Sequence, residues 1–239
     1  MKNIQLSAYI GAVIMWDKII FSDWEIIYRK NNGFENIETH EHIDYLHFIV
    51  NYMGYPVLID SGLASYMSNH IHANARNAEY HNSLLIDDYA YMPMKNKIFP
   101  DKYYATSNSS AKIETQTGYK IILKTSGFNR IDKNINFERH LLVEDKSLTI
   151  VDNSNSKNDH KIENYFHFDS NLKFIKDSGS FKFSLNGISM KFINHDNELS
   201  NNDLNICSKQ YGSTELKRVL NSKSIINDAN PIIHRISII

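Results

Sequence analysis

The sequence predicts an all-β protein, built as a two-sheet antiparallel β-sandwich that follows a short N-terminal helix. From residue 110 onward, short apolar or alternating runs are separated by turn-forming clusters of Asn, Ser, Asp and Gly, which is typical of sandwiches. Aromatic residues make up 12% of the chain, and aromatic side chains favour strands. Helical and strand patterns do not alternate, so nothing predicts a parallel α/β sheet.

The length sets the domain organisation. A chain of 239 residues, 42% of them hydrophobic, is long enough to bury a core, which excludes disorder as a class. We expect an N-terminal segment over residues 1–20, with an amphipathic or buried helix at 4–16, and a single β domain over residues 21–239.

The expected strands follow in chain order. A strand is expected at Trp24–Arg29. A second is expected over residues 40–50, whose pattern fits side chains that alternate between the two faces of a strand. A turn at 51–54 predicts a hairpin to a strand over 55–60, and the apolar run at 81–87 predicts a third strand. Further strands are expected at 111–116, 119–124, 135–144, 147–152, 161–168, 172–176, 180–184 and 188–194.

Charge and composition exclude several classes of protein. The net charge of -1 argues against a basic nucleic-acid binder, and no apolar run reaches the ~18 residues of a membrane-spanning helix. The single cysteine, Cys207, excludes a disulfide framework and a cysteine-rich zinc site. The apolar stretch after Lys2 faintly resembles a signal peptide, but no small-residue cleavage site follows it.

Histidines and one aspartate carry the chemical signal. His40 and His42 project to the same face of the expected strand, Asp60 ends the hairpin partner, and His81 starts a strand that we expect alongside. Imidazole nitrogen and carboxylate oxygen are ligands that zinc accepts, so the pattern is consistent with a divalent-metal site. The spacing leaves open whether His40, His42 or Asp44 is the ligand. A polar strand face and a turn-capping aspartate would explain the same residues without metal.

Three motifs resemble the heparinase II/III-like polysaccharide lyases. They are His40-Glu41-His42-Ile43-Asp44, the Gly-x-Pro-Val-Leu-x-Asp-x-Gly run from Gly54 to Gly62, and His81-Asn82-Ser83. Weaker similarity, including the strand pair over 137–152, extends the match to about residues 21–239. The resemblance implies the C-terminal β-sandwich of such an enzyme.

The family resemblance also implies roles for individual residues. His40 matches a cleft-facing catalytic histidine, and His42, Asp60 and His81 match the ligands of one structural zinc ion. Because His40 and His42 share a face, these separate roles need a bulge or twist in the strand. Asp44 is then expected to accept a hydrogen bond from a ligand rather than to bind metal.

Other residues receive lower weight. Tyr66 and Arg76 fall in the loop between Asp60 and His81, where a cleft wall is expected. Arg76 could bind the carboxylate of a uronate, and an exposed loop arginine would explain it equally well. His47 alternates onto the face opposite His40 and is read as structural. Arg139 is expected to form a core ion pair in preference to a cleft contact.

The leading functional hypothesis is a carbon–oxygen lyase domain that acts by β-elimination on an acidic, uronate-containing polysaccharide such as a glycosaminoglycan or alginate. In the family an (α/α) toroid provides the other cleft wall. This chain has no toroid, so we expect a truncated enzyme, one that works with a separate toroid chain, or an inactive remnant. The alternatives are a non-catalytic, zinc-stabilised carbohydrate-binding module and a small metal-dependent hydrolase. The resemblance implies a periplasmic or secreted location, and the sequence alone leaves a cytoplasmic one open.

Overall fold

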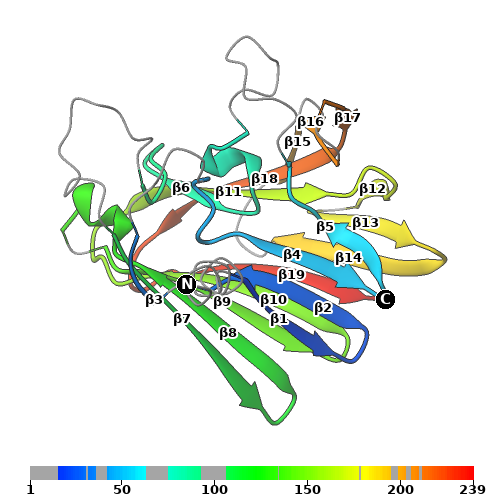
Figure 1. Ribbon diagram of the computed structural model, residues 1–239, viewed down its shortest axis with the longest axis horizontal. Coiled ribbons are helices and arrows are strands. Elements are labelled where there is room, and N and C mark those ends of the chain that lie inside the picture. Colours follow the sequence, from blue (N-terminus) through cyan, green and yellow to red (C-terminus); the bar gives the residue numbers. More distant parts are fainter. Residues whose placement is uncertain are drawn as a thin grey trace, which may run out of the picture.

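A computed structural model describes most of the chain, and all structural statements below refer to that part. The described residues are 16–30, 32–35, 42–62, 75–92, 106–133, 135–177, 179–194, 199–202, 206–209 and 212–239. They form two large sheets and one small one, and every strand pair with a described register is antiparallel. The predicted all-β sandwich is confirmed (Figure 1).

The first sheet has eight strands in the order β1-β2-β4-β5-β11-β18-β15, with β6 paired to β11. Their bounds are β1 Trp16–Phe21, β2 Trp24–Arg29, β4 Phe48–Tyr52, β5 Tyr55–Leu58, β6 Leu84–Ile86, β11 His160–Phe168, β15 Leu199–Asn202 and β18 Arg218–Ile226. This sheet carries the residues of the candidate site. Its central hairpin, β4–β5, turns at Met53 and Gly54, which both have positive φ, as the favoured two-residue turn requires.

The second sheet has nine strands in the order β12-β13-β14-β19-β10-β9-β8-β7-β3. Their bounds are β3 Asn32–Glu35, β7 Thr106–Thr115, β8 Gly118–Thr125, β9 Phe137–Glu144, β10 Ser147–Ser154, β12 Lys173–Asp177, β13 Ser180–Leu185, β14 Ile188–Asn194 and β19 Ile232–Ile238. Two short strands, β16 Ile206–Cys207 and β17 Glu215–Leu216, pair with each other, and the 3-10 helices are η1 Ala78–Tyr80 and η3 Gly127–Arg130.

The core lies between the two large sheets. Alternate residues of β9 are buried, including Leu141 and Val143, because one face of each strand points inward. They belong to the same apolar cluster as Trp24, Ile26 and Phe48 of the first sheet. Each fully buried aliphatic or aromatic side chain of this kind contributes roughly 1.5–3 kcal/mol by leaving water.

The N-terminal prediction needs a correction. Residues 16–20 belong to β1, which pairs with β2 from Trp16↔Arg29 to Phe21↔Trp24, so the helical segment expected over 1–20 is wrong for residues 16–20. Pairing with β2 gives this apolar run a partner for its backbone, which a strand needs. Residues 1–15, and with them the predicted helix at 4–16, lie outside the described residues.

Two predicted strands near the site are also shorter than expected. The run at 40–50 becomes a strand only at Phe48, because a turn closes before it, with the His47 amide donating to the Asp44 carbonyl at 2.8 Å. The run at 81–87 is a strand only over Leu84–Ile86. This strand, β6, pairs with residues 162–164 of β11 and not with the β4–β5 hairpin. The hairpin pairs with β11 only at the other end of that strand, at Phe168↔Leu58. No helix in the described part is long and apolar enough to cross a membrane.

Candidate metal centre

Asp60 stands just beyond the end of β5, in a loop whose conformation the local sequence dictates. The amide of Ile59 donates to the His167 carbonyl at 2.8 Å, and the amide of Gly62 donates to Asp60 Oδ2 at 2.9 Å. Gly62 has φ +63, and a Cβ there would collide with the Ser208 carbonyl. The glycine of the Asp-x-Gly motif is therefore required by both conformation and space.

His81 follows η1 and is only 1% exposed. Its Nδ1 lies 2.6 Å from Asp60 Oδ1, and since an ionised carboxylate only accepts, Nδ1 carries the proton in this contact. The other ring nitrogen, Nε2, is buried and has no hydrogen-bond partner. An ion that binds both His81 and Asp60 must replace the proton on Nδ1, so His81 would coordinate it through Nδ1, the atom that faces Asp60.

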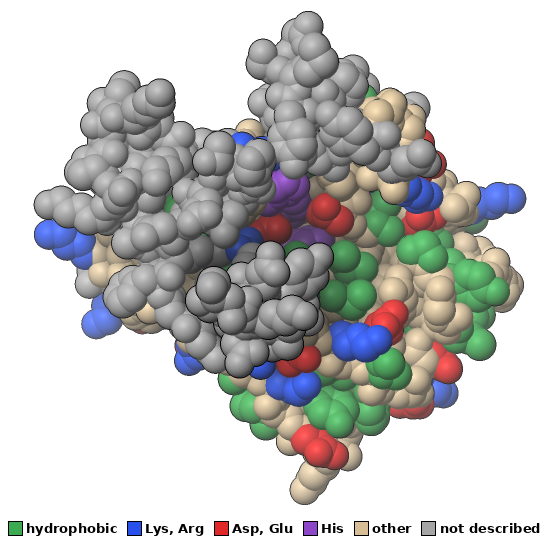
Figure 2. Space-filling model, in the orientation of Figure 1, with side chains coloured by type: hydrophobic (Ala, Val, Ile, Leu, Met, Phe, Trp, Pro, Cys, Tyr) green, Lys and Arg blue, Asp and Glu red, His purple; other side chains and the backbone are tan. Residues whose placement is uncertain are grey.

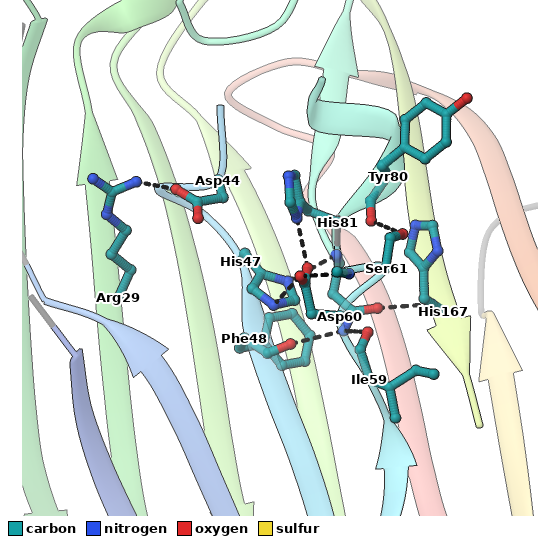
Figure 3. Close-up of polar contacts among 12 residues, drawn as sticks. Arg29, Asp44, His47, Phe48, Ile59, Asp60, Ser61, Tyr80, His81 and His167 are labelled. Carbon is teal, nitrogen blue, oxygen red and sulfur yellow. Dashed lines mark hydrogen bonds and ion pairs between the residues drawn. The ribbon is translucent and has the colours of Figure 1, made fainter. Parts of the chain in front are cut away.

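His47 approaches Asp60 from the turn that precedes β4 and is also 1% exposed. Its Nε2 lies 3.4 Å from Asp60 Oδ1, and its ring centroid lies 5.4 Å from that of His81. The edge of Trp16 in β1 packs near the His47 ring, with centroids 6.0 Å apart. His47, Asp60 and His81 thus gather one donor atom each within 4.8 Å of one another (Figure 3).

His42 and Arg76 lie beside this cluster. The ring centroid of His42 is 5.2 Å from that of His81, and His42 is partly buried. Burial and the charge of His81 lower the pKa of His42, and the charge of Arg76 acts in the same direction. The Ile43 amide donates to the Arg76 carbonyl at 2.9 Å, which ties the two segments together. Histidine and acidic side chains consequently meet near the middle of the face seen in Figure 2.

The charges within the cluster oppose its burial. Burial alone would raise the pKa of Asp60, yet the charge and hydrogen bond of His81 hold it well below the ordinary value. Burial works to lower the pKa of His81, but Asp60 outweighs it and the pKa is raised. Burial lowers the pKa of His47 to about 4 despite Asp60, so His47 is neutral near pH 7. The raised pKa of His81 and the lowered pKa of Asp60 both result from the attraction between the carboxylate and the protonated ring, and His47 beside them is a neutral imidazole.

A buried lysine closes the other side of the loop. Lys217 is 4% exposed, and its Nζ donates to Ser61 Oγ, which in turn donates to the Tyr80 carbonyl. Burial lowers the pKa of Lys217 to about 8, against the raising effect of Asp60. Nothing in the sequence pattern marked this lysine, because a single Lys before an apolar strand normally reads as a strand end.

The structure brings together part of the predicted site. Asp60 and His81 are in contact, and His42 lies next to His81, whereas His40 and Tyr66 fall outside the described residues. The interpretation of His47 as a side chain on the opposite face was wrong. Alternation along a strand does not apply to residues 42–47, because a bend and a turn carry His47 to Asp60. Its position seven residues after His40 gave no signal.

Two further predictions concern the surroundings. Asp44 contacts Arg29 in an ion pair, which is a different partner from the metal ligand expected for it. Arg139 forms the predicted core ion pair, with Nε 2.7 Å from Asp152 Oδ1 and both side chains fully buried. The Arg139 side chain is fully buried, so it does not reach the surface.

The donor set fits a metal ion of the zinc type. Nδ1 of His81 and Oδ1 of Asp60 face each other at 2.6 Å, and the ring of His42 lies beside that of His81. Two imidazoles and a carboxylate are ligands that zinc accepts in catalytic and structural sites alike.

The fold and the cluster define a class: an antiparallel β-sandwich with a candidate metal centre at the end of its central hairpin. A family model described as heparinase II/III-like, C-terminal, matches residues 30–229. The chain therefore belongs to the heparinase II/III-like family, of which it carries the C-terminal domain, and the resemblance drawn from the three motifs is confirmed. A search of curated proteins finds no match.

Solved structures agree with this assignment at the level of the fold. A heparan sulfate lyase from Pedobacter heparinus aligns with a TM-score of 0.68 and 12% identity over 90% of this chain and 33% of its own. A heparinase III structure aligns with a TM-score of 0.68 and 13% identity over 94% and 35%. A putative mutarotase from Salmonella typhimurium aligns with a TM-score of 0.53 and 8% identity over 94% and 93%. The chain thus spans about a third of the length of these lyases.

Proposed function

We propose that this chain supplies the β-sandwich wall of a polysaccharide lyase cleft and acts by β-elimination on a uronate-containing polysaccharide. The observation that carries the proposal is the position of His42, beside the Asp60–His81 pair inside a domain of the heparinase II/III-like family. His40 is two residues away, so the centre anchors the chain next to the predicted catalytic histidine.

The chemistry assigns tasks to the residues of this wall. β-Elimination removes the proton at C5 of a uronate and expels the oxygen linked at C4, which needs a neutralised carboxylate, a base and an acid. His40, near neutrality, suits the base or the neutralising role, and Arg76 suits the substrate carboxylate because its guanidinium can bind both oxygens. Tyr66 is the tyrosine of this wall that we propose as a further base or acid.

The second wall must come from residues outside the sandwich. Described strands of the two sheets run from Trp16 to Ile238, so an (α/α) toroid has to be provided by a separate chain or by residues beyond these 239. Positioning between two walls can account for roughly 7–11 kcal/mol of a barrier, and each 1.4 kcal/mol is about tenfold in rate. We therefore expect no measurable turnover by the 239-residue chain alone.

Binding and turnover test this role together. The purified chain is titrated with heparan sulfate, alginate and neutral dextran, and product formation is followed by the ultraviolet absorbance of the unsaturated sugar. We expect binding to a uronate polymer, none to dextran, no turnover, and weaker binding by Arg76→Met. The Lys18→Met variant, which removes a cation of the exposed Lys18–Glu25 pair, is the charge-matched control. Turnover by the chain alone would contradict the need for a toroid, and failure to bind any uronate polymer would contradict the substrate class.

We further propose one structural zinc ion per chain, held by His42, Asp60 and His81. When bound, zinc would tie the turn before β4 to the loop after β5 and thereby set the path of the chain toward His40. Because a metal that binds only the native state adds to folding free energy, chelation should lower the melting temperature.

Two alanine variants test this division of roles. Asp60→Ala should melt at the temperature of the chelated wild type and should not respond further to chelator. His40→Ala should melt with the wild type and keep its response, since it is assigned to the cleft. Equal loss of stability and of chelator response in both variants would show that the roles are wrongly divided.

The alternative is a non-catalytic, zinc-stabilised carbohydrate-binding module. One observation favours it: the putative mutarotase aligns with this chain over 93% of its own length, so a sandwich of this fold can constitute nearly a whole protein. Glycan binding that persists in His40→Ala, together with no gain of activity when a toroid chain is supplied, would favour the module over the lyase.

A further inference from the structure

Three imidazoles surround Asp60, and their hydrogen bonds show that they are not equivalent. His47 and His81 look alike at first: both are buried, and both have an Nε2 atom without a hydrogen bond. The difference lies at Nδ1. In His81 this atom faces the Asp60 carboxylate, whereas in His47 it receives the backbone N–H of Asn82 at 2.9 Å.

The bond from Asn82 fixes the tautomer of His47. A backbone N–H can only donate, so Nδ1 of His47 must offer a lone pair. A neutral imidazole has one N–H, and it must then sit on Nε2; a doubly protonated ring could not accept this bond at all. Nε2 of His47 therefore carries a hydrogen and has no lone pair for a metal, and it lies 3.4 Å from Asp60 Oδ1.

The donor in this argument is itself held in place. The side chain of Asn82 donates from Nδ2 to the carbonyls of Phe48 at 2.7 Å and Ile59 at 3.1 Å, and its Oδ1 accepts the His167 amide at 2.7 Å. Its own carbonyl accepts from Arg139 at 3.0 Å. Asn82 thus joins β4, the β5 loop and β11, so the N–H that faces His47 cannot turn away without breaking these bonds.

We propose that His47 is a positioning residue of the metal centre, whose Nε2–H orients the Asp60 carboxylate, and that it is not a ligand. The inference rests on the zinc site proposed above. His81 has the opposite arrangement, with its proton on Nδ1 toward Asp60, and zinc can replace that proton and so bind Nδ1 and the carboxylate together. Of the two histidines closest to Asp60, only His81 is then prepared to bind metal, and His42 is the remaining imidazole beside it.

Nuclear magnetic resonance tests the tautomer in the unaltered protein. Long-range proton–nitrogen correlation spectra of the ¹⁵N-labelled full chain report which ring nitrogen carries hydrogen. We expect the Nε2–H form for His47 both without metal and with one equivalent of Zn²⁺. A proton on Nδ1, or loss of the Nε2 proton on zinc addition, would overturn the proposal.

Two amide variants separate positioning from ligation. His47→Gln places a donor where Nε2 stood, and His47→Asn places an acceptor where Nδ1 stood but has no donor toward Asp60. We expect the zinc dissociation constant to stay within about tenfold of wild type in His47→Gln and to rise by roughly 10–100-fold in His47→Asn. The visible spectrum of Co²⁺-loaded protein should keep its shape in both, because the ligands are unchanged.

His42→Gln is the matched ligand variant, and it should alter the Co²⁺ spectrum. If both His47 variants alter the spectrum as His42→Gln does, His47 is a ligand and the proposal fails. If the wild type binds no stoichiometric Zn²⁺ or Co²⁺, the metal site itself is wrong, and the positioning role falls with it even when the tautomer is as expected. The spectra of the metal-free protein distinguish these two failures.

Discussion

Two buried polar networks meet at Asn82 in this domain, and they differ in how completely their charged and imidazole groups are paired. In the first, the guanidinium of Arg139 uses all five of its N–H donors, on Asp152, Asn164 and the carbonyls of Leu46 and Asn82. In the second, around Asp60, two imidazole nitrogens are buried with no hydrogen bond. Complete pairing is typical of a structural ion pair, whereas the carboxylate and imidazoles of the second network are groups that can hold a metal ion.

The networks share Asn82, and this explains why they lie together. The backbone carbonyl of Asn82 accepts a hydrogen bond from Arg139, and its backbone N–H donates one to His47. The network of Arg139 thereby fixes the backbone from which the network around Asp60 is built. A metal centre needs ligands whose orientation is set before the ion arrives, and a saturated core ion pair is a rigid support for it.

The largest expected effect comes from the saturated network. Arg139→Met removes the cation and leaves Asp152 as a buried, unpaired carboxylate, which should lower the free energy of unfolding by roughly 3–5 kcal/mol. Urea unfolding of chelator-treated protein measures this. A loss below about 1 kcal/mol would show that the pairing is not stabilising the core.

Acid should act mainly on the second network. The unfolded state binds a proton at His47 near pH 6.5, but the folded state resists it down to about pH 4, so the metal-free protein loses stability as pH falls through this window. At about 1.4 kcal/mol per pKa unit the loss from His47 is about 3 kcal/mol. His167, whose pKa burial holds well below its ordinary value, adds to the loss.

His81 works in the opposite direction. Its raised pKa gives stability that is present below pH 6.5 and lost as pH rises through its folded value. The effect of His47 should still dominate in acid, so the free energy of unfolding in urea should decline from pH 7 to pH 4. This decline should be shallower in His47→Gln, which lacks the buried imidazole. Lys18→Met, which keeps every histidine, should decline as steeply as wild type. An equally steep decline in His47→Gln would show that His47 is not buried as a neutral ring.

The smallest effect should come from an exposed ion pair. Lys18 and Glu25 face each other across β1 and β2 at 3.2 Å, with side chains 59% and 29% exposed. Water screens such pairs, so Lys18→Met should change the free energy of unfolding by less than about 1 kcal/mol. A change comparable to that of Arg139→Met would mean that burial does not decide the strength of ion pairs in this domain.

The sequence predicted several strands of the second sheet well, because their alternation and turns are local signals, but β3 and β19 were not among the expected strands. The expected strand at 188–194 matches β14 at both ends, and the expected 135–144 differs from β9 only at its start. The segment around the site was predicted less well. Whether residues 42–47 form a strand depends on hydrogen bonds to Asp44 and Arg76, which alternation alone does not reveal.

The candidate site was predicted in part for a similar reason. Asp60 and His81 belong to motifs that mark the family, and the structure brings them into contact. His47 and Lys217 reach the same place through a turn and a neighbouring strand, so their proximity is tertiary and has no spacing rule. The assignment of His42 as the third ligand stays a prediction.

The central claim is that the incompletely paired network is a metal site. Elemental analysis of the full chain, purified without a polyhistidine tag, tests it most directly. We predict about one zinc ion per chain in the wild type, the same content in Lys18→Met, and little or none in the His42→Ala, His81→Ala double variant. Wild-type protein without stoichiometric metal, or a double variant that retains its zinc, would contradict the account.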